Sequence, residues 1–490
     1  MKRFTWTLCA SAILLSAGWG LGALENPAKD SLDDSAAPPS TPQLGISVGP
    51  DVTIKDLSGI SNHTFGGGSP CPPGYGSGAE NCRGYSVGTN SCNVGSIPLD
   101  WCDQIGGCRT TTDAFHPLAP ATVSDHSVIS QNMYRLKDGR FEQIGASFLK
   151  HGFFSLNTPS SDCAWNDGGV PNTSCVQPPA GGDQLGVGCT DFYNSGLNGN
   201  RPMGRRSDVQ VAGADHPPSA AGGETDDAYD QRIVVAESHL DPAQNAGALY
   251  WMEGQYVVRD DARAGNGLNN ASHRQATVGA LPSLNVSMTG PTIRELPAIF
   301  AWQSIDPEVD IVAVDKRTFF LGEEADAPID PGTFYPNYTV TERFWAARKV
   351  TLTGGPTPYH YEYAIYNLNS DTSADSFTID FGQSATFSGA GFRDLPHHSG
   401  EPYDTSDWTI DVDGPNGTVT WTAVDMGTDT NALRWGFTFN FWFDADIGPN
   451  HSSHTLGTFK DSGSLDVPFD DIVLAAIFAD GFESGDTSAW

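Results

Sequence analysis

Cysteine is the residue type whose spacing says most about the chemistry of this chain. Eight of the nine cysteines fall between positions 71 and 189, and the ninth, Cys9, lies near the start. An even set of cysteines in an exported protein is typical of a disulfide framework. Zinc and iron–sulfur sites usually contain a close Cys-x-x-Cys pair, and none occurs here. We therefore expect disulfides, in a connectivity that the spacing does not determine, among Cys71, Cys82, Cys92, Cys102, Cys108, Cys163, Cys175 and Cys189.

A run of acidic and amide residues between positions 260 and 270 is the best candidate for a cation site. Carboxylate and amide oxygens are the ligands that calcium prefers, and calcium takes six to eight of them. The spacing is not that of an EF-hand. Capping of turns by the same side chains is the alternative. Calcium is thus the one cofactor that the sequence suggests, with the candidate ligands Asp260, Asp261, Asn266, Asn269 and Asn270.

Two groups of histidines are further candidates. His126 and His151, with Asn132 and Lys150, could perform acid–base chemistry if they were buried together. His398 and Glu401 belong to a second group, in which neutral imidazoles beside carboxylates could hold a transition metal. Structural hydrogen bonding is the alternative for both groups. It is favoured for the first, because a lone histidine on a strand more often satisfies a hydrogen bond. It is favoured for the second, because adjacent histidines in a strand, such as His397 and His398, face opposite sides.

The sequence lacks the common catalytic motifs. It contains no Gly-x-Ser-x-Gly, no His-Glu-x-x-His, no phosphate-binding Gly-x-x-x-x-Gly-Lys-Ser/Thr and no dinucleotide fingerprint. These absences lower the expectation of an enzyme without excluding one, because catalytic triads are assembled in space rather than in sequence.

Composition and the first residues indicate export. Residues 1–23 have the basic start, apolar core and small residues of a signal peptide, and the apolar core is too short for a membrane span. Residues 24–49 are rich in Pro, Ser, Asp and Ala and predict a disordered linker. The net charge of −33 repels nucleic acid and anionic membranes. No later segment has the length of apolar sequence that a transmembrane span requires.

Hydrophobic periodicity predicts a mainly β protein. Residues 50–290 are dense in Cys, Gly and Pro and predict a disulfide-stapled, loop-rich β region, with a hairpin turn at Asp138-Gly139. Residues 291–465 alternate with period two and predict a β-sandwich-like domain. Its clearest strand spans residues 433–444, with Leu433, Trp435 and every second residue to Phe443 on one buried face. We expect a bend near Gly436, and little effect of substitution at Thr438 on the opposite face.

Several stretches resemble a family of secreted bacterial proteins of unknown activity. The likeness runs from about residue 50 to 460 and rests on wording such as Lys150-His-Gly-Phe153, His398-Ser-Gly-Glu401 and these longer stretches: residues 91–101, 131–145, 186–199, 245–257, 266–272 and 360–370. The resemblance implies export and a shared fold, and it assigns no catalytic residue. Within the tail, 466–490, residues 478–490 look like a segment found on many unrelated proteins exported by Gram-negative bacteria. That likeness implies a sorting or processing role.

These observations predict a protein that is secreted or held on the outer surface of a Gram-negative bacterium. The leading hypothesis is a non-enzymatic binding or scaffolding protein for an extracellular ligand or surface partner, with no affinity for nucleic acid. The alternative is a secreted hydrolase that acts on a polysaccharide or another extracellular polymer, since paired carboxylates of the kind glycosidases use are abundant.

Overall fold

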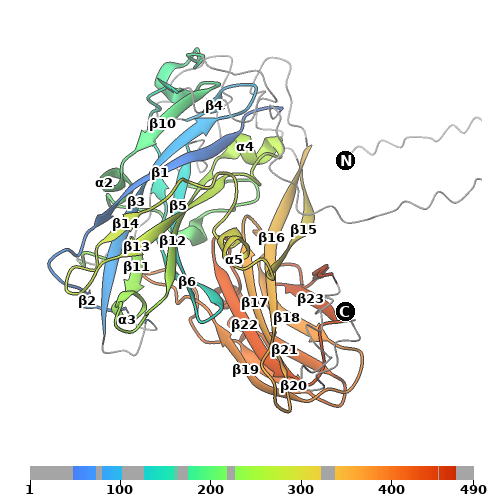
Figure 1. The fold of residues 1–490 in the computed structure, drawn as a ribbon. Helices are drawn as coiled ribbons and strands as arrows, with labels where there is room; N and C mark the ends of the chain where they lie inside the picture. The colour runs from blue at the N-terminus through green and yellow to red at the C-terminus, as the bar shows by residue number, and fades with distance from the viewer. Residues whose placement is uncertain are drawn as a thin grey trace, which may run out of the picture. The chain divides into compact units, whose positions relative to one another are not determined.

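A computed structural model describes residues 48–72, 75, 80–101, 126–160, 163, 175–217, 227–321, 337–450 and 452–470. The fold is mainly β, as the alternation of apolar and polar residues predicts, and every pairing between the described strands is antiparallel. The strands form four main sheets (Figure 1). The described residues all belong to one compact unit. No helix among the described residues is long and apolar enough to cross a membrane.

The first two sheets are built from strands before residue 289. In the first, the order β1-β3-β10-β8 is extended by β2 and β11, which both pair with β3. Its strands are β1 (Val52–Asn62), β2 (Ser69–Pro70), β3 (Asn81–Asn93), β8 (Thr158–Pro159), β10 (Cys189–Tyr193) and β11 (Ile233–Ala236). The second has the order β14-β13-β12-β5-β6, with β7 paired to β5. Its strands are β5 (Val128–Lys137), β6 (Arg140–Ala146), β7 (Lys150–His151), β12 (Leu249–Val257), β13 (Ala271–Val278) and β14 (Val286–Met288).

These two sheets share a hydrophobic core. Ile54 and Val87 of the first sheet belong to the same buried cluster as Met133 and Met252 of the second. The sheets approach closely at Gly254, where a Cβ would lie 2.9 Å from Cδ1 of Ile54. A larger residue there would displace the Ile54 side chain, so glycine lets the backbone of β12 pack directly on the side chains of β1.

Two more sheets contain the strands after residue 309. One has the order β15-β16-β17-β22-β19 and the other the order β20-β21-β18-β23-β24. The first consists of β15 (Asp310–Leu321), β16 (Asn337–Leu352), β17 (Tyr359–Asn367), β19 (Phe387–Arg393) and β22 (Thr438–Ala445). The second consists of β18 (Ala374–Asp380), β20 (Thr409–Asp413), β21 (Thr418–Thr422), β23 (Ser453–Thr458) and β24 (Ser464–Asp466).

Aromatic residues fill the space between the last two sheets. The Trp421 ring lies 5.4 Å from the Phe441 ring, and Tyr363 lies 5.4 Å from Phe377, measured between centroids. Each pair joins one sheet to the other, so the two sheets form the β-sandwich that the alternation predicts. Offset and edge-to-face pairs of this kind add about 0.5–1.5 kcal/mol each beyond the burial of their area.

Short elements connect the sheets. They are β4 (Leu99–Asp100), which pairs with β9 (Gln184–Leu185), the helices α2 (Ser195–Asn198), α3 (Glu237–Leu240), α4 (Arg259–Ala264) and α5 (Phe300–Ile305), and the 3-10 turns Gly181–Asp183, Arg206–Asp208 and Gly427–Asp429.

The strand predicted over residues 433–444 is divided by a bend. Gly436 has φ +74°, a left-handed conformation that favours glycine, and the regular strand β22 begins only at Thr438. Leu433 and Phe437 stay in the aromatic core, whereas Trp435 packs in a different cluster with Val128 and Leu149. The expected bend is present, and the single continuous face is not.

The second face of β22 is covered as well. Thr438 is 1% exposed, and its backbone N–H donates to Oε1 of Gln143 on β6. Asn440 donates to the backbone oxygen of Phe141 on the same strand. The hairpin of β5 and β6 therefore covers the face of the strand opposite the aromatic core. The expectation that Thr438 would be insensitive to substitution took no account of this cover.

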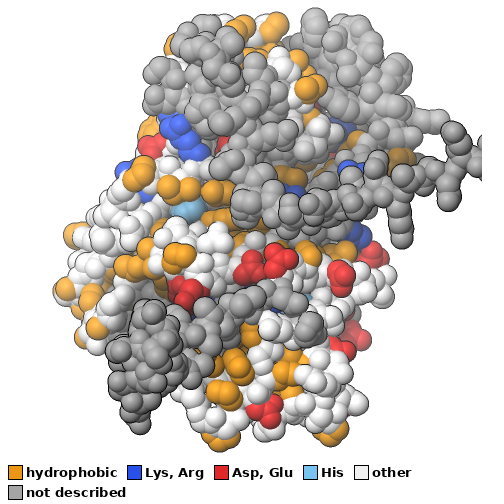
Figure 2. Space-filling view, turned by 45° about the vertical axis from the view of Figure 1, so that its right-hand side comes forward, with side chains coloured by type: hydrophobic (Ala, Val, Ile, Leu, Met, Phe, Trp, Pro, Cys, Tyr) orange, Lys and Arg blue, Asp and Glu red, His pale blue; other side chains and the backbone are white. Residues whose placement is uncertain are grey.

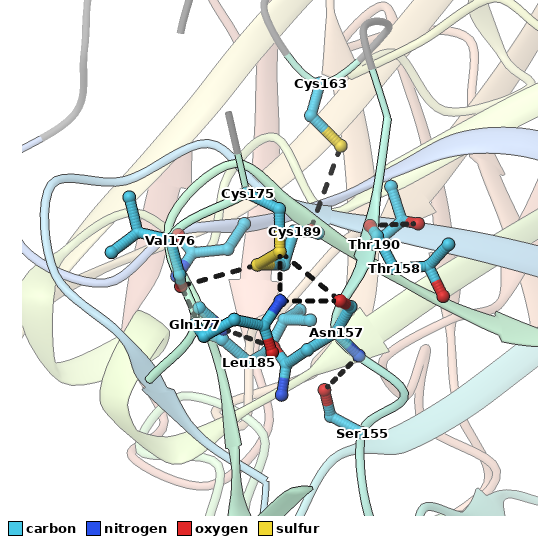
Figure 3. The surroundings of a disulfide bond; sticks show 12 residues. Ser155, Asn157, Thr158, Cys163, Cys175, Val176, Gln177, Leu185, Cys189 and Thr190 are labelled. Carbon is cyan, nitrogen blue, oxygen red and sulfur yellow. Dashed lines mark hydrogen bonds between the residues drawn. A yellow bond between two sulfur atoms is a disulfide. The ribbon is translucent and has the colours of Figure 1, made fainter. Parts of the chain in front are cut away.

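Disulfides staple the first part of the chain. Cys71 pairs with Cys82, Cys92 with Cys163, and Cys175 with Cys189. Cys102 and Cys108 lie outside the described residues. Figure 3 shows the Cys175–Cys189 bridge beside Cys163, whose Sγ contacts the backbone oxygen of Cys189 at 3.8 Å. Gln177 anchors the same loop by donating to the backbone oxygen of Asn157. Two of these bridges start from β3 and the third from β10, and each ties its strand to a segment with little secondary structure of its own.

Candidate metal centre

Three buried histidines form the cluster that is best suited to chemistry. One ring nitrogen from each of His126, His151 and His216 lies within 4.8 Å of the other two. The side chains are 0%, 2% and 3% exposed, respectively. Among the residues that the structure describes, these three form the one group of three or more His, Cys, Asp or Glu side chains close enough to hold a metal ion. We call them the three-histidine cluster.

Strand pairing brings His126 and His151 together. His126 lies two residues before the start of β5, and β7 pairs antiparallel with β5 so that His151 lies opposite Val128. The two rings meet with Nε2 of His126 2.7 Å from Nδ1 of His151. This distance is that of a hydrogen bond, in which one nitrogen donates and the other accepts.

His216 arrives from a separate turn. Residues 210 and 215 form an isolated antiparallel bridge, and Ala214 within this turn has φ +56°. The ring of His216 lies 4.7 Å from that of His126 and 5.5 Å from that of His151, measured between centroids. Its Nε2 is 2.8 Å from the backbone oxygen of His126, and its Nδ1 is 3.0 Å from that of Pro217.

One carbonyl contact of His216 suits a metal ligand, and the other must be given up before an ion can bind. A neutral imidazole carries one N–H, so His216 can donate to only one of the two carbonyl oxygens that it faces. The other nitrogen then presents a lone pair. Histidines that bind metals commonly donate their second ring nitrogen to a backbone carbonyl, which fixes the tautomer and the orientation of the ring. His216 has such a carbonyl available on either side.

Burial keeps His151 and His216 neutral, as metal ligands must be. It lowers the pKa of His151 to about 3, and the nearby His216 and Lys150 charges add to this effect. Burial also lowers the pKa of His216, against the opposing effect of its two backbone hydrogen bonds. One buried apolar cluster contains a residue two positions from each histidine, namely Val128, Leu149 and Ala214.

Zinc can bind this ligand set only after the nitrogens move in both directions: the three lie within 4.8 Å of one another, and a pair at that limit must close by about 1.5 Å. Zinc–nitrogen bonds of 2.0–2.1 Å at tetrahedral angles place two ligand nitrogens about 3.3 Å apart. Binding therefore requires the 2.7 Å separation of His126 and His151 to open by about 0.6 Å. Three neutral imidazoles suit zinc, copper, nickel or cobalt better than calcium or magnesium, which prefer oxygen.

The sequence analysis predicts two members of this cluster, His126 and His151, and does not include the third, His216. His126 and His151 were grouped with Asn132 and Lys150, and the structure joins the two histidines. Asn132 lies elsewhere, where it donates to Oε1 of the buried Glu253 and to the backbone oxygen of Gly436. His216 lies in a stretch that reads as a polar loop, 65 positions beyond His151. No local signal connects residues at such separations.

The predicted calcium ligands hold the start of β1. Residues 259–264 form α4 rather than a loop, which places Asp260 and Asp261 on a helix. Asp261 accepts from the backbone N–H of Val52 at 3.0 Å and from Asn270 at 2.7 Å. Asn269 donates to both carboxylate oxygens of Asp51. Burial and the nearby charge of Asp51 raise the pKa of Asp261 well above its ordinary value.

The other two candidates of that loop are engaged in similar contacts. Asp260 accepts from the backbone N–H of Asp100 at 3.1 Å. Asn266 donates to the backbone oxygens of Val48 and Pro50. All of these contacts fasten β1 and its neighbours to the end of β12. Calcium binding by these residues stays a prediction.

The second histidine group makes structural contacts. His398 lies 2.8 Å from the backbone oxygen of Ala146 through Nε2, and 2.8 Å from Oγ of Ser399 through Nδ1. Glu401 accepts from the backbone N–H groups of Arg206 and Ser207. Burial lowers the pKa of His398 to about 4 and raises that of Glu401. These two residues fasten the loop after β19 to the first part of the chain.

Comparisons with known proteins do not assign this arrangement to a family. Neither a scan against protein-family models nor a search of curated proteins found a match.

Proposed function

We propose that this is an extracellular, non-enzymatic binding protein whose β framework holds a transition metal ion, with zinc as the best fit. The single observation that carries the proposal is the meeting of three buried imidazoles from three different segments at one point. Neutral imidazole is the most common metal-ligating side chain, and three of them supply most of a tetrahedral zinc site.

A metal ion at this point would stabilise the fold. The histidines lie 25 and 90 residues apart along the chain, so a shared ion would join segments that are distant in sequence. An ion that binds the folded state alone adds RT ln(1 + [L]/Kd), about 2.7 kcal/mol when the free ion is at a hundred times its Kd. This role resembles that of the disulfides, which staple other loops of the same region.

Secretion also forms part of the proposal. It is supported by the signal-like first residues, the disulfides and the net charge of −33. On the face drawn in Figure 2, acidic side chains are spread among apolar and polar ones rather than gathered in one patch. A surface of this kind favours solubility and disfavours nucleic acid.

A second candidate function follows from the number of ligands. Catalytic zinc sites commonly have three protein ligands and keep the fourth position for water. The three-histidine cluster matches that number, which favours a secreted zinc hydrolase as the alternative. Burial of all three side chains favours the binding role, because a polymer substrate must reach the ion.

Metal titration tests the proposal. The purified protein, freed of metal with a chelator, should bind one zinc ion in calorimetry, and the ion should raise its Tm. His216→Gln should abolish binding while keeping the fold, which circular dichroism would show. His63→Gln is the matched control, because His63 lies outside the cluster and contacts Ser86. No zinc binding by the wild type would overturn the proposal. Zinc-dependent hydrolysis of esters or polysaccharides that His216→Gln abolishes would favour the enzyme.

A further inference from the structure

The charge around the three-histidine cluster has a consequence for what the site binds. Each of the three ligands is a neutral imidazole, so a divalent ion would keep its full charge of two. Among the described residues, no carboxylate or thiolate belongs to the group. The side chains are at most 3% exposed, and a charge buried without a counter-charge costs several kcal/mol.

The nearest described carboxylate in sequence is engaged elsewhere. Asp215 directly precedes His216, yet its Oδ1 accepts from Nε of Arg259 at 3.0 Å and lies 3.6 Å from Nη2 of Arg263. Two guanidinium groups thus hold this oxygen on α4. The carboxylate nearest to His216 in sequence is therefore already paired with two cationic side chains.

A cationic side chain neighbours the cluster in sequence. Lys150 directly precedes His151, and it is one of the charged groups that act on this histidine. Its ammonium lies 5.5 Å from the centre of the Phe153 ring. The described residues around the ion therefore add positive rather than negative charge at this edge.

We propose that the metal-loaded cluster takes a small monoanion, such as a carboxylate or a halide, as its fourth ligand. This inference rests on the proposed function, since it requires the metal. Three protein nitrogens leave one tetrahedral position, and an anion there meets the need for both a ligand and a counter-charge. The anion replaces a water molecule on the ion, so no bond within the protein changes.

Cobalt(II) makes the fourth position visible, because its visible absorption responds to the ligands that surround it. The chelator-treated protein is loaded with cobalt(II) in perchlorate, which coordinates weakly, and is then titrated with azide, acetate or chloride. We expect a saturable change in the absorption spectrum with each anion. Zinc should also bind more tightly in chloride than in perchlorate of equal ionic strength.

Two variants locate the effect. Lys150→Gln should weaken azide binding by about three- to tenfold, because one nearby positive charge is lost. It should retain cobalt binding, since Lys150 is not a ligand. Lys137→Gln is the matched control, because Lys137 donates to the backbone oxygen of Gln244 in an exposed contact and should leave azide binding unchanged.

The possible outcomes separate the two proposals. Cobalt binding with a spectrum that no anion alters would overturn the anion proposal and leave the metal site standing, with water or a further protein group in the fourth position. Failure of cobalt and zinc to bind in perchlorate and in chloride alike would overturn the metal site itself. Anion-dependent spectra that persist in His216→Gln would show that the anion binds elsewhere, and would also overturn the anion proposal.

Discussion

The backbone of Gly204 lies directly against the imidazole of His151. Gly204 and Leu149 exchange two backbone hydrogen bonds of 2.8 Å, and a Cβ at Gly204 would overlap Nε2 of His151. The segment that contains Gly204 therefore approaches the three-histidine cluster at a point where an added side chain would displace the His151 ring. This contact fixes the position of one proposed ligand without any bond to it.

Gly204→Ala tests this contact. The new methyl group should push the His151 ring away from His126, weaken zinc binding and destabilise the protein by about 1–3 kcal/mol through overpacking. Calorimetric titration with zinc and urea unfolding measure the two effects. Gly66→Ala is the control, because a Cβ there meets nothing within 4 Å. Equal zinc affinity in the two variants would show that the approach of Gly204 does not position the ring.

Phe439→Ala should be among the most damaging substitutions in the second half of the chain. Phe439 is 0% exposed, and its ring lies 5.5 Å from that of Trp408 and 5.6 Å from that of Phe392. Replacement of a buried phenylalanine by alanine costs about 3–5 kcal/mol. Urea unfolding measures the loss. Phe319→Ala provides the comparison at an exposed position, since Phe319 is 59% exposed and should change stability by about 0.5 kcal/mol or less.

Much of the fold could be predicted from the sequence, because apolar alternation reports which strands have a buried face. Asp138 and Gly139 adopt φ 52° and 85° and join β5 to β6, as the hairpin signal predicts. Alternation of apolar and polar residues does not reveal that the β5–β6 hairpin covers the polar face of β22. Thr438 and Asn440 therefore could not be recognised as buried.

The site was harder to predict than the fold. Pairing of β7 with β5 places His151 beside His126, and neither strand pairing nor register can be read from the separate segments. The position of His216 is set by a turn in which Ala214 has a left-handed conformation. Alanine rarely adopts this conformation, so the turn could not be predicted from the sequence. The Asp260–Asn270 region, by contrast, was recognised as polar and ordered, but its contacts with β1 span about 200 residues and carry no local signal.

The disulfides should differ in their contribution to stability. By loop-closure entropy, the Cys92–Cys163 bridge, which spans 71 residues, stabilises the fold by about 4.4 kcal/mol. The Cys71–Cys82 bridge, which spans 11 residues, contributes about 2.8 kcal/mol. Paired Cys→Ser variants and urea unfolding compare them. A larger loss on removal of Cys71–Cys82 would mean that native contacts rather than chain entropy determine these contributions.

Stability should depend on pH through His360. Nε2 of this ring lies 3.1 Å from Glu362 and Nδ1 lies 2.7 Å from Asp444, while Arg140 pairs with the same Glu362. The contact with Glu362 is the main cause that raises the pKa of His360, and burial opposes it. A raised pKa in the folded state stabilises the protein while the ring is protonated. The contribution is complete below the ordinary value of 6.5 and is lost as the pH rises through the folded pKa.

His360→Gln should remove this dependence. Unfolding in urea at a series of pH values from mildly acidic to mildly alkaline compares the variant with the wild type. The difference in unfolding free energy should be largest at the acidic end and shrink as the pH rises. A difference that stays constant with pH would mean that the folded protein does not favour the protonated ring.

Asp261→Ala should destabilise the start of β1. The substitution leaves the buried N–H of Val52 and the amide of Asn270 without their acceptor, at a cost of about 1–3 kcal/mol. Asp261→Asn keeps one acceptor and should cost less. Calcium adds a second readout: it should raise the Tm of the wild type and not that of Asp261→Ala. A wild-type Tm that calcium leaves unchanged would leave Asp261 with its structural role alone.

The bend at Gly436 sets a condition on how the chain can fold. Its backbone oxygen accepts from Asn132, Gln143 and Arg206, which lie 304, 293 and 230 residues earlier. Contacts of such long range form slowly, because a large loop must close before they contribute. A chain released before residue 436 would keep these three buried donors without their acceptor. The first half should therefore complete its folding only when the last strands of the second half are available. The polypeptide must stay incompletely folded until nearly the whole chain is present.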